Sequence, residues 1–175
     1  MTEVERFLDA AERYCGLIDS LDSLSRYEFV SAVNLILPEL YRAAIDLPDR
    51  FIDGPEPPDV DQSPDLFHLI QAKLADRDGY RGVIDPWDRS EEAVDPSLAD
   101  DLADIYHDLQ IVRTDDRGGA GVWDWRWRFV YHWGAHAAQA LLATHWLLYP
   151  AGEGWLDPSE RPVEDNESEG PEGTE

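Results

Sequence analysis

The segment that most constrains the fold spans residues 122–149. It holds five of the seven tryptophans and three of the five histidines, and no proline interrupts it before Pro150. Unbroken length at helical periodicity is typical of an α-helix. We therefore expect residues 122–149 to form one long helix. Its many apolar groups predict that this helix lies at the centre of the domain.

Two further helices are predicted to begin at capping boxes, in which a Ser or Thr and a Glu three residues later bond each other's backbone. Thr2 and Glu5 form the first box, and Ser25 and Glu28 form the second. Apolar residues follow each box at spacings of three and four, which is the pattern of an amphipathic helix. We expect Pro38 to kink the second helix, because its ring clashes with the preceding turn.

Two stretches that contain several prolines and glycines, residues 47–63 and 76–94, are predicted to be loops. A short helix should follow the first loop, and a fourth should run from residue 98 to about residue 113. The sequence therefore predicts an all-α fold: a bundle of about five helices, with a long C-terminal helix rich in Trp and His, and two Pro/Gly-containing loops.

Residues 1–150 should form this bundle as a single domain. Residues 151–175 are acidic, rich in Pro, Gly and Ser, and almost without apolar side chains. Such a segment cannot bury enough apolar surface to offset its ordering entropy. We expect a disordered tail whose removal leaves the stability of the bundle nearly unchanged.

The charge of the chain limits its partners. Acidic residues number 38 against 14 basic ones, a formal net charge of -24. So acidic a surface repels nucleic acid and anionic membranes, and it suits a basic protein partner or a salty cytoplasm. Cys15 is the only cysteine, and the first residues lack the pattern of a signal peptide. We expect a cytoplasmic protein without a disulfide.

Several motifs together resemble those of a known bacterial family. They are Ser97-Leu-Ala-Asp-Asp-Leu-Ala-Asp-Ile-Tyr, Trp123-x-Trp125-Arg126, His132-Trp-Gly-x-His136-Ala, Tyr14-Cys15 and Asp85-Pro86. The chain is similar over roughly residues 3–148 to the family catalogued as domain of unknown function 5063. The resemblance implies a small helical bacterial protein and no particular activity.

The long helix and the helix before it carry a candidate buried polar cluster. At about 100° per residue, Arg126 falls near the centre of the apolar face of the long helix, with His132 and His136 on one flank. Asp101, Asp104 and Asp108 form a stripe on the preceding helix, which should run antiparallel to the long one. An unpaired guanidinium in an apolar face is not tolerated. We therefore expect Arg126 to pair with Asp108 or Asp104, and Arg126→Met to destabilise the fold strongly.

This cluster has two interpretations. In the first, the aspartates neutralise Arg126, the histidines bond at the edge of the core, and no cofactor binds. In the second, His132, His136 and Asp104 hold one divalent metal, because two imidazoles one helical turn apart can ligate one ion. The pair lacks the glutamate of the His-Glu-x-x-His motif, so we favour the structural interpretation.

Clustered tryptophans suggest a second candidate site. Trp123, Trp125 and Trp127 alternate and cannot share one helical face, so at least one of them should be semi-exposed or meet the loops. In one interpretation Trp125 and Trp127 cover the end of the bundle and pack on Trp87 or Tyr80. In the other, the four tryptophans form an aromatic contact surface. Complete catalytic motifs are lacking. The leading hypothesis is a non-enzymatic protein-binding or regulatory bundle with an unidentified, possibly basic, protein partner. The alternative is a metal-dependent enzyme that uses His132, His136 and Asp104.

Overall fold

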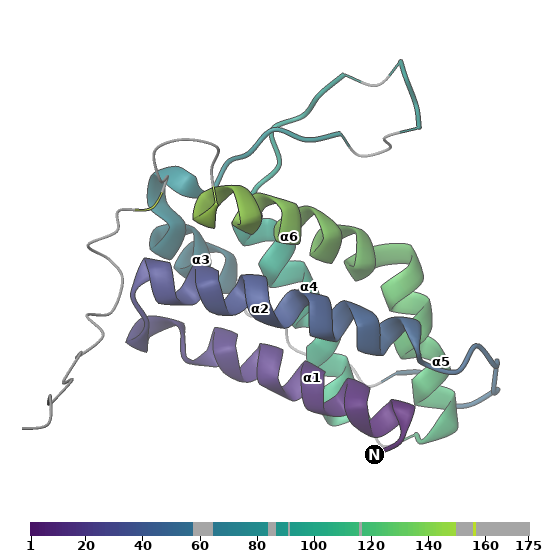
Figure 1. The fold of residues 1–175 in the computed structure, drawn as a ribbon. Coiled ribbons are helices and arrows are strands. Elements are labelled where there is room, and N and C mark those ends of the chain that lie inside the picture. Colours follow the sequence, from purple (N-terminus) through teal and green to yellow (C-terminus); the bar gives the residue numbers. More distant parts are fainter. Residues whose placement is uncertain (58–64, 84–86, 91, 116, 150–155, 157–175) are drawn as a thin grey trace, which may run out of the picture.

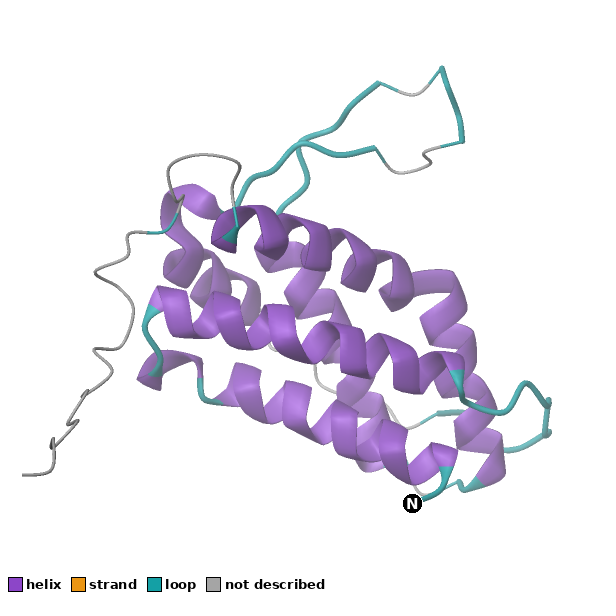
Figure 2. Ribbon diagram, viewed as in Figure 1, coloured by secondary structure: helices purple, strands orange, loops and turns teal. Residues whose placement is uncertain are grey.

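The computed structural model describes residues 1–57, 65–83, 87–90, 92–115, 117–149 and 156. Within these residues the chain is an all-α bundle (Figures 1 and 2). The helices are α1 (Glu3–Asp19), α2 (Arg26–Ile45), α3 (Leu66–Leu74), α4 (Leu98–Thr114), α5 (Gly119–Arg128) and α6 (Gly134–Leu148), and a π-helical segment (Phe129–Trp133) joins the last two. α5, the π segment and α6 follow one another without a break and form one helical rod. With this rod taken as one helix beside α1, α2, α3 and α4, the prediction of about five helices is confirmed.

The first two helices begin at the predicted capping boxes. The Glu5 amide donates to Thr2 Oγ1 over 3.1 Å, and the Thr2 amide donates to Glu5 Oε2 over 2.7 Å. Ser25 and Glu28 make the same reciprocal pair at the start of α2. The second helix then runs unbroken through Pro38 to Ile45. None of the described helices is long and apolar enough to cross a membrane.

Four helices surround the core. α1 packs on α2 and α4, and α6 packs on the same two helices, while α3 packs on α4 (Figure 1). Burial follows the predicted face of α6: Trp133, Ala137, Ala140 and Thr144 are all buried. The hydroxyl of buried Tyr14 donates to the Leu102 carbonyl over 2.9 Å, which ties α1 to α4. The burial of these apolar side chains between the four helices is the main contribution to the stability of the domain.

The long helix differs from its prediction in one respect, the π segment. Upstream of Trp133 the buried positions include Gly121, Trp125 and Phe129, each four residues from the next, and Ala120 beside them. A π turn holds one more residue than an α turn, so it rotates α5 relative to α6 by about 100°. Gly134 permits this junction, because a Cβ there would lie 2.3 Å from the Phe129 carbonyl oxygen.

The predicted loop after α3 is fixed at its base. Gly82 and Val94 exchange backbone hydrogen bonds of 3.0 and 2.9 Å, and the Tyr80 amide donates to the Pro96 carbonyl over 3.1 Å. Buried Asp78 accepts the Ala99 amide over 2.8 Å, at the start of α4. Carboxylates are favoured at a helix N-terminus, so this contact sets where α4 begins.

The predicted tail, residues 151–175, lies almost entirely outside the described residues. The exception is Leu156, which is 4% exposed and belongs to the core. The small effect expected from removal of the tail stays a prediction, and the burial of Leu156 is the observation that bears against it.

We predict that Leu156→Ala lowers the free energy of unfolding by about 2–5 kcal/mol, the range for a buried Leu→Ala change. The matched control is Leu35→Ala, because Leu35 is 70% exposed and should change stability by no more than about 0.5 kcal/mol. Urea denaturation followed by circular dichroism measures both. Equal, small effects would contradict the packing of Leu156.

Candidate metal centre

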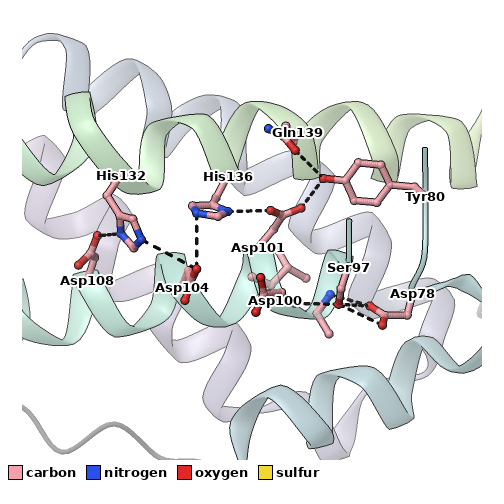
Figure 3. Close-up of polar contacts among 12 residues, drawn as sticks. Asp78, Tyr80, Ser97, Asp100, Asp101, Asp104, Asp108, His132, His136 and Gln139 are labelled. Carbon is pink, nitrogen blue, oxygen red and sulfur yellow. Dashed lines mark hydrogen bonds and ion pairs between the residues drawn. The ribbon is translucent and has the colours of Figure 1, made fainter. Parts of the chain in front are cut away.

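Two polar rows meet where α4 faces the rod formed by α5 and α6. The row on α4 is Asp101, Asp104 and Asp108. The row on the rod has members four residues apart: Arg128, His132 and His136. Figure 3 shows the two histidines, His132 from the π segment and His136 from α6, pointing down toward the three aspartates. The structure therefore brings together five of the six residues of the predicted polar cluster, all except Arg126.

Two buried carboxylates fix the histidines. His132 Nδ1 lies 2.7 Å from Asp108 Oδ2, and His136 Nδ1 lies 2.7 Å from Asp101 Oδ1. Asp101 and Asp108 are only 3% and 6% exposed, so each carboxylate is held in one position by the helix packing around it. Buried carboxylates need partners for their charge, and the imidazoles supply them.

Each carboxylate has a second partner. Arg128 Nη1 donates to the other oxygen of Asp108 over 2.7 Å. The Tyr80 hydroxyl donates to the other oxygen of Asp101 over 2.5 Å and lies 3.1 Å from Gln139 Oε1 (Figure 3). Burial and the bond to Asp101 raise the pKa of Tyr80, so the hydroxyl keeps the proton that it donates.

The remaining nitrogens of the two histidines converge on Asp104. Its Oδ2 lies 3.5 Å from His136 Nε2 and 3.9 Å from His132 Nε2. One ligand atom from each of the three residues lies within 4.8 Å of the other two. The His132 side chain is 48% exposed and that of Asp104 is 35% exposed, so the cluster opens to solvent.

The bonds at Nδ1 set the chemistry at Nε2. When Nδ1–H donates to a carboxylate, a neutral imidazole carries its lone pair on Nε2, the atom that faces Asp104. The hydrogen bond to Asp101 raises the pKa of His136 against the opposing effect of burial, and the nearby aspartates add to the rise. His136 lies between two carboxylates, with Nδ1 2.7 Å from Asp101 and Nε2 3.5 Å from Asp104, so the surroundings of Nε2 favour a positive charge. A proton or a metal ion supplies such a charge.

Comparison with known proteins identifies the family. The sequence profile of the family described as "Domain of unknown function (DUF5063)" matches residues 1–150. The chain belongs to that family. The crystal structure of protein BF1032 from Bacteroides fragilis has a TM-score of 0.69 to this chain at 23% identity, over 86% of this chain and 95% of that one. No curated protein matches. The family and the fold are thus confirmed, and neither comparison names an activity.

In this DUF5063 protein Arg126 has no part in the cluster, so its predicted pairing is wrong. Its Nη1 donates to the Ile45 carbonyl over 3.0 Å, at the end of α2, and its Nε lies 3.8 Å from Asp49. The π segment explains the error: it shifts α5 by one position, so Trp125 takes the buried place expected for Arg126. Arg128 then pairs with Asp108.

The predicted tryptophan surface is not one surface. Trp125 is 4% exposed and its indole donates to Asp115 over 2.9 Å. Trp123 packs edge-on against Phe51, and Trp127, half exposed, contacts Tyr131 with the two rings tilted by 39°. Trp87 is 90% exposed, on the loop that projects beyond α6 at a distance from α5 (Figure 1). The four side chains therefore do not form a common contact patch.

A second polar cluster, at the start of α5, was not predicted. Arg117 binds Asp115 over 2.7 Å and Asp124 over 2.7 Å, and the side chains of Arg117 and Asp115 are 7% and 0% exposed. Burial opposes ionisation of Asp115, but hydrogen bonds from Arg117 and Trp125 outweigh it and lower the pKa. Gly121 makes room, because a Cβ there would lie 2.5 Å from Asp115 Oδ2. The contacts of this cluster support the start of α5.

We predict that Arg117→Met, and not Arg126→Met, destabilises the fold strongly. Removing Arg117 leaves Asp115 buried without its cation, which costs about 3–5 kcal/mol. Removing Arg126 loses hydrogen bonds to carbonyls at a helix end, about 0.5–1.5 kcal/mol. Urea denaturation of the two variants measures the difference, and the reverse order would contradict this assignment of the buried pair.

Proposed function

We propose that His132, His136 and Asp104 bind one divalent transition-metal ion, and that the protein is a metal-dependent enzyme. The observation that carries the proposal is the pair of buried carboxylates behind the histidines. Metal-binding histidines generally donate their other ring N–H to a carboxylate, a backbone carbonyl or water, which fixes the ring and raises its basicity. Here both histidines have such a partner, Asp108 for one and Asp101 for the other.

The spacing of the ligand atoms supports a metal better than a salt bridge. Two ligand atoms on tetrahedral zinc, each about 2.0–2.1 Å from the ion, lie roughly 3.3 Å apart. Asp104 Oδ2 is 3.5 and 3.9 Å from the two Nε2 atoms, too long for strong hydrogen bonds and close to the separation across an ion. The imidazoles already have carboxylate partners, so charge neutralisation alone does not require Asp104.

The ligand set indicates the chemistry. Two imidazoles and one carboxylate suit zinc or iron(II), and three protein ligands leave coordination positions for water and substrate. The exposure of His132 and Asp104 leaves the solvent side of the site open. Metal ions in such open sites lower the pKa of bound water and supply a nucleophile at neutral pH. We therefore propose a hydrolytic reaction on a small molecule.

The remaining proposals concern the substrate class, a protein partner and the location of the enzyme. A net charge of -24 argues against nucleic acid as a substrate. The protein-binding hypothesis rests on the lack of a complete catalytic motif, on the acidic surface and on the clustered tryptophans, and the burial of Trp125 weakens the last of these grounds. We place the enzyme in the bacterial cytoplasm, as the sequence predicts.

Metal titration tests the proposal. Protein purified without an affinity tag, stripped with a chelator and titrated with zinc sulfate in a calorimeter should bind one ion. His132→Ala and His136→Ala should each abolish stoichiometric binding, because each removes a ligand. Asp101→Asn should weaken binding about 10- to 100-fold, because it removes a carboxylate that orients a ligand.

His145→Ala is the matched control. His145 is on the same helical rod but contacts Tyr149, outside the cluster, so this variant should bind zinc as the unmodified protein does. Titration in moderate salt suppresses diffuse binding of zinc to the acidic surface. Equal binding by the His136→Ala and His145→Ala variants, or no stoichiometric binding at all, would refute the metal site.

A further inference from the structure

A cavity lies beside the proposed metal centre. It has a volume of about 620 Å³, between α6 and the loop that follows α3. Tyr80, Arg81 and Val83 line it from the loop, and Ala135, Ala138 and Leu142 line it from α6. Small-molecule sites commonly measure about 300–1,000 Å³ and are mostly apolar with a few polar groups. This cavity fits that description in both size and lining.

The backbone of the loop holds the wall of the cavity in place. Gly82 and Val94 are paired by two hydrogen bonds, and the Tyr80 amide is bonded to Pro96. A second cavity of about 420 Å³ shares Tyr80, Arg81 and Leu142 and continues along α6 to Trp146. Together the two cavities form an elongated apolar groove whose walls are set by helix and backbone contacts.

Arg81 gives the groove its charge preference. It lines both cavities, and it makes no ion pair or hydrogen bond with any residue that the structure describes. The chain has a net charge of -24, so most of its surface repels anions. The exposed guanidinium of Arg81 offers an anion a positive charge within the groove. Apolar walls and one cation together favour a ligand with an apolar body and a single anionic group.

Tyr80 connects the groove to the metal centre. Its ring lines both cavities, and its hydroxyl donates to Asp101, the carboxylate that holds His136 (Figure 3). Ala135 and Gln139, both in the cavity wall, lie one residue before and three residues after His136 on α6. A ligand in the groove therefore contacts the residues that flank and orient one of the proposed metal ligands.

We infer that this groove binds a small apolar monoanion, and that the ligand is the substrate of the neighbouring centre. The second half of this inference rests on the proposed function, whereas the first half stands without a metal. The class is an aliphatic or aromatic molecule with one carboxylate or sulfonate group. The apolar body occupies the groove, and Arg81 binds the anionic group.

A matched pair of fluorescent probes tests the groove on the full-length, metal-free protein. 8-Anilinonaphthalene-1-sulfonate has an apolar body and one anionic group, and N-phenyl-1-naphthylamine has nearly the same body without the charge. Both should bind with one-to-one stoichiometry. Arg81→Gln should weaken the sulfonate probe about tenfold and the neutral probe less than about twofold, since only the former loses an ionic contact.

Ala138→Phe fills the groove and should weaken both probes at least about tenfold. Ala138 is exposed, and Ala93→Phe, from the opposite wall, provides an independent block if the first variant folds poorly. Arg50→Gln is the charge control and should change neither probe, because Arg50 is exposed and does not line the groove. Unchanged binding in both blocked variants would overturn the site, and loss of Arg81 without effect would overturn the anionic class.

The link to the metal has a separate test. Tyr80→Phe keeps the aromatic wall and removes the hydrogen bond to Asp101. It should leave the binding of both probes within about twofold and weaken zinc binding about tenfold, as for other residues that orient a ligand. Normal zinc affinity in this variant would overturn the link while leaving the groove standing. Probe binding without zinc binding in the unmodified protein would refute the metal centre alone.

Discussion

The arrangement of this bundle depends on two carboxylates buried between α4 and the rod formed by α5, the π segment and α6. Asp101 and Asp108 lie almost out of contact with water, where an unpaired charge is costly. Each is satisfied from two sides: Asp108 by Arg128 and His132, Asp101 by Tyr80 and His136. The same contacts that make the buried charges tolerable fix both imidazole rings and direct Nε2 toward Asp104. Stability and candidate chemistry therefore share one set of hydrogen bonds.

Much of the fold could be predicted from the sequence, because local rules dominate in helices. The capping boxes at Thr2 and Ser25 mark helix starts within a few residues, whatever the rest of the chain does. The apolar face of α6 and the membership of His132, His136 and the aspartates in one cluster follow from the spacing of residues. The partner of Asp108 in α5 could not be predicted, since the π segment changes the phase of α5 by one residue. Arg128 rather than Arg126 therefore faces α4.

Contacts between segments that are distant in the sequence also could not be predicted. Tyr80 reaches Asp101 only because Gly82, Val94 and Pro96 hold the loop base against α4, and no local pattern signals that pairing. The indole of Trp125 donates to Asp115 in the turn before α5, a contact that the alternation of the tryptophans in the sequence does not indicate. The groove beside the candidate metal centre is a product of similar contacts between distant segments. It borders the only cluster of three potential metal ligands found among the described residues.

The central claim is that His132, His136 and Asp104 surround one metal ion. Anomalous diffraction from crystals grown with zinc, measured on both sides of the zinc absorption edge, tests it most directly. The claim predicts one strong anomalous peak about 2.0–2.2 Å from both Nε2 atoms and from an Asp104 carboxylate oxygen, with Asp101 and Asp108 still bonded to Nδ1. A zinc-soaked crystal with no peak there, and with Asp104 bonded directly to protonated histidines, would contradict it.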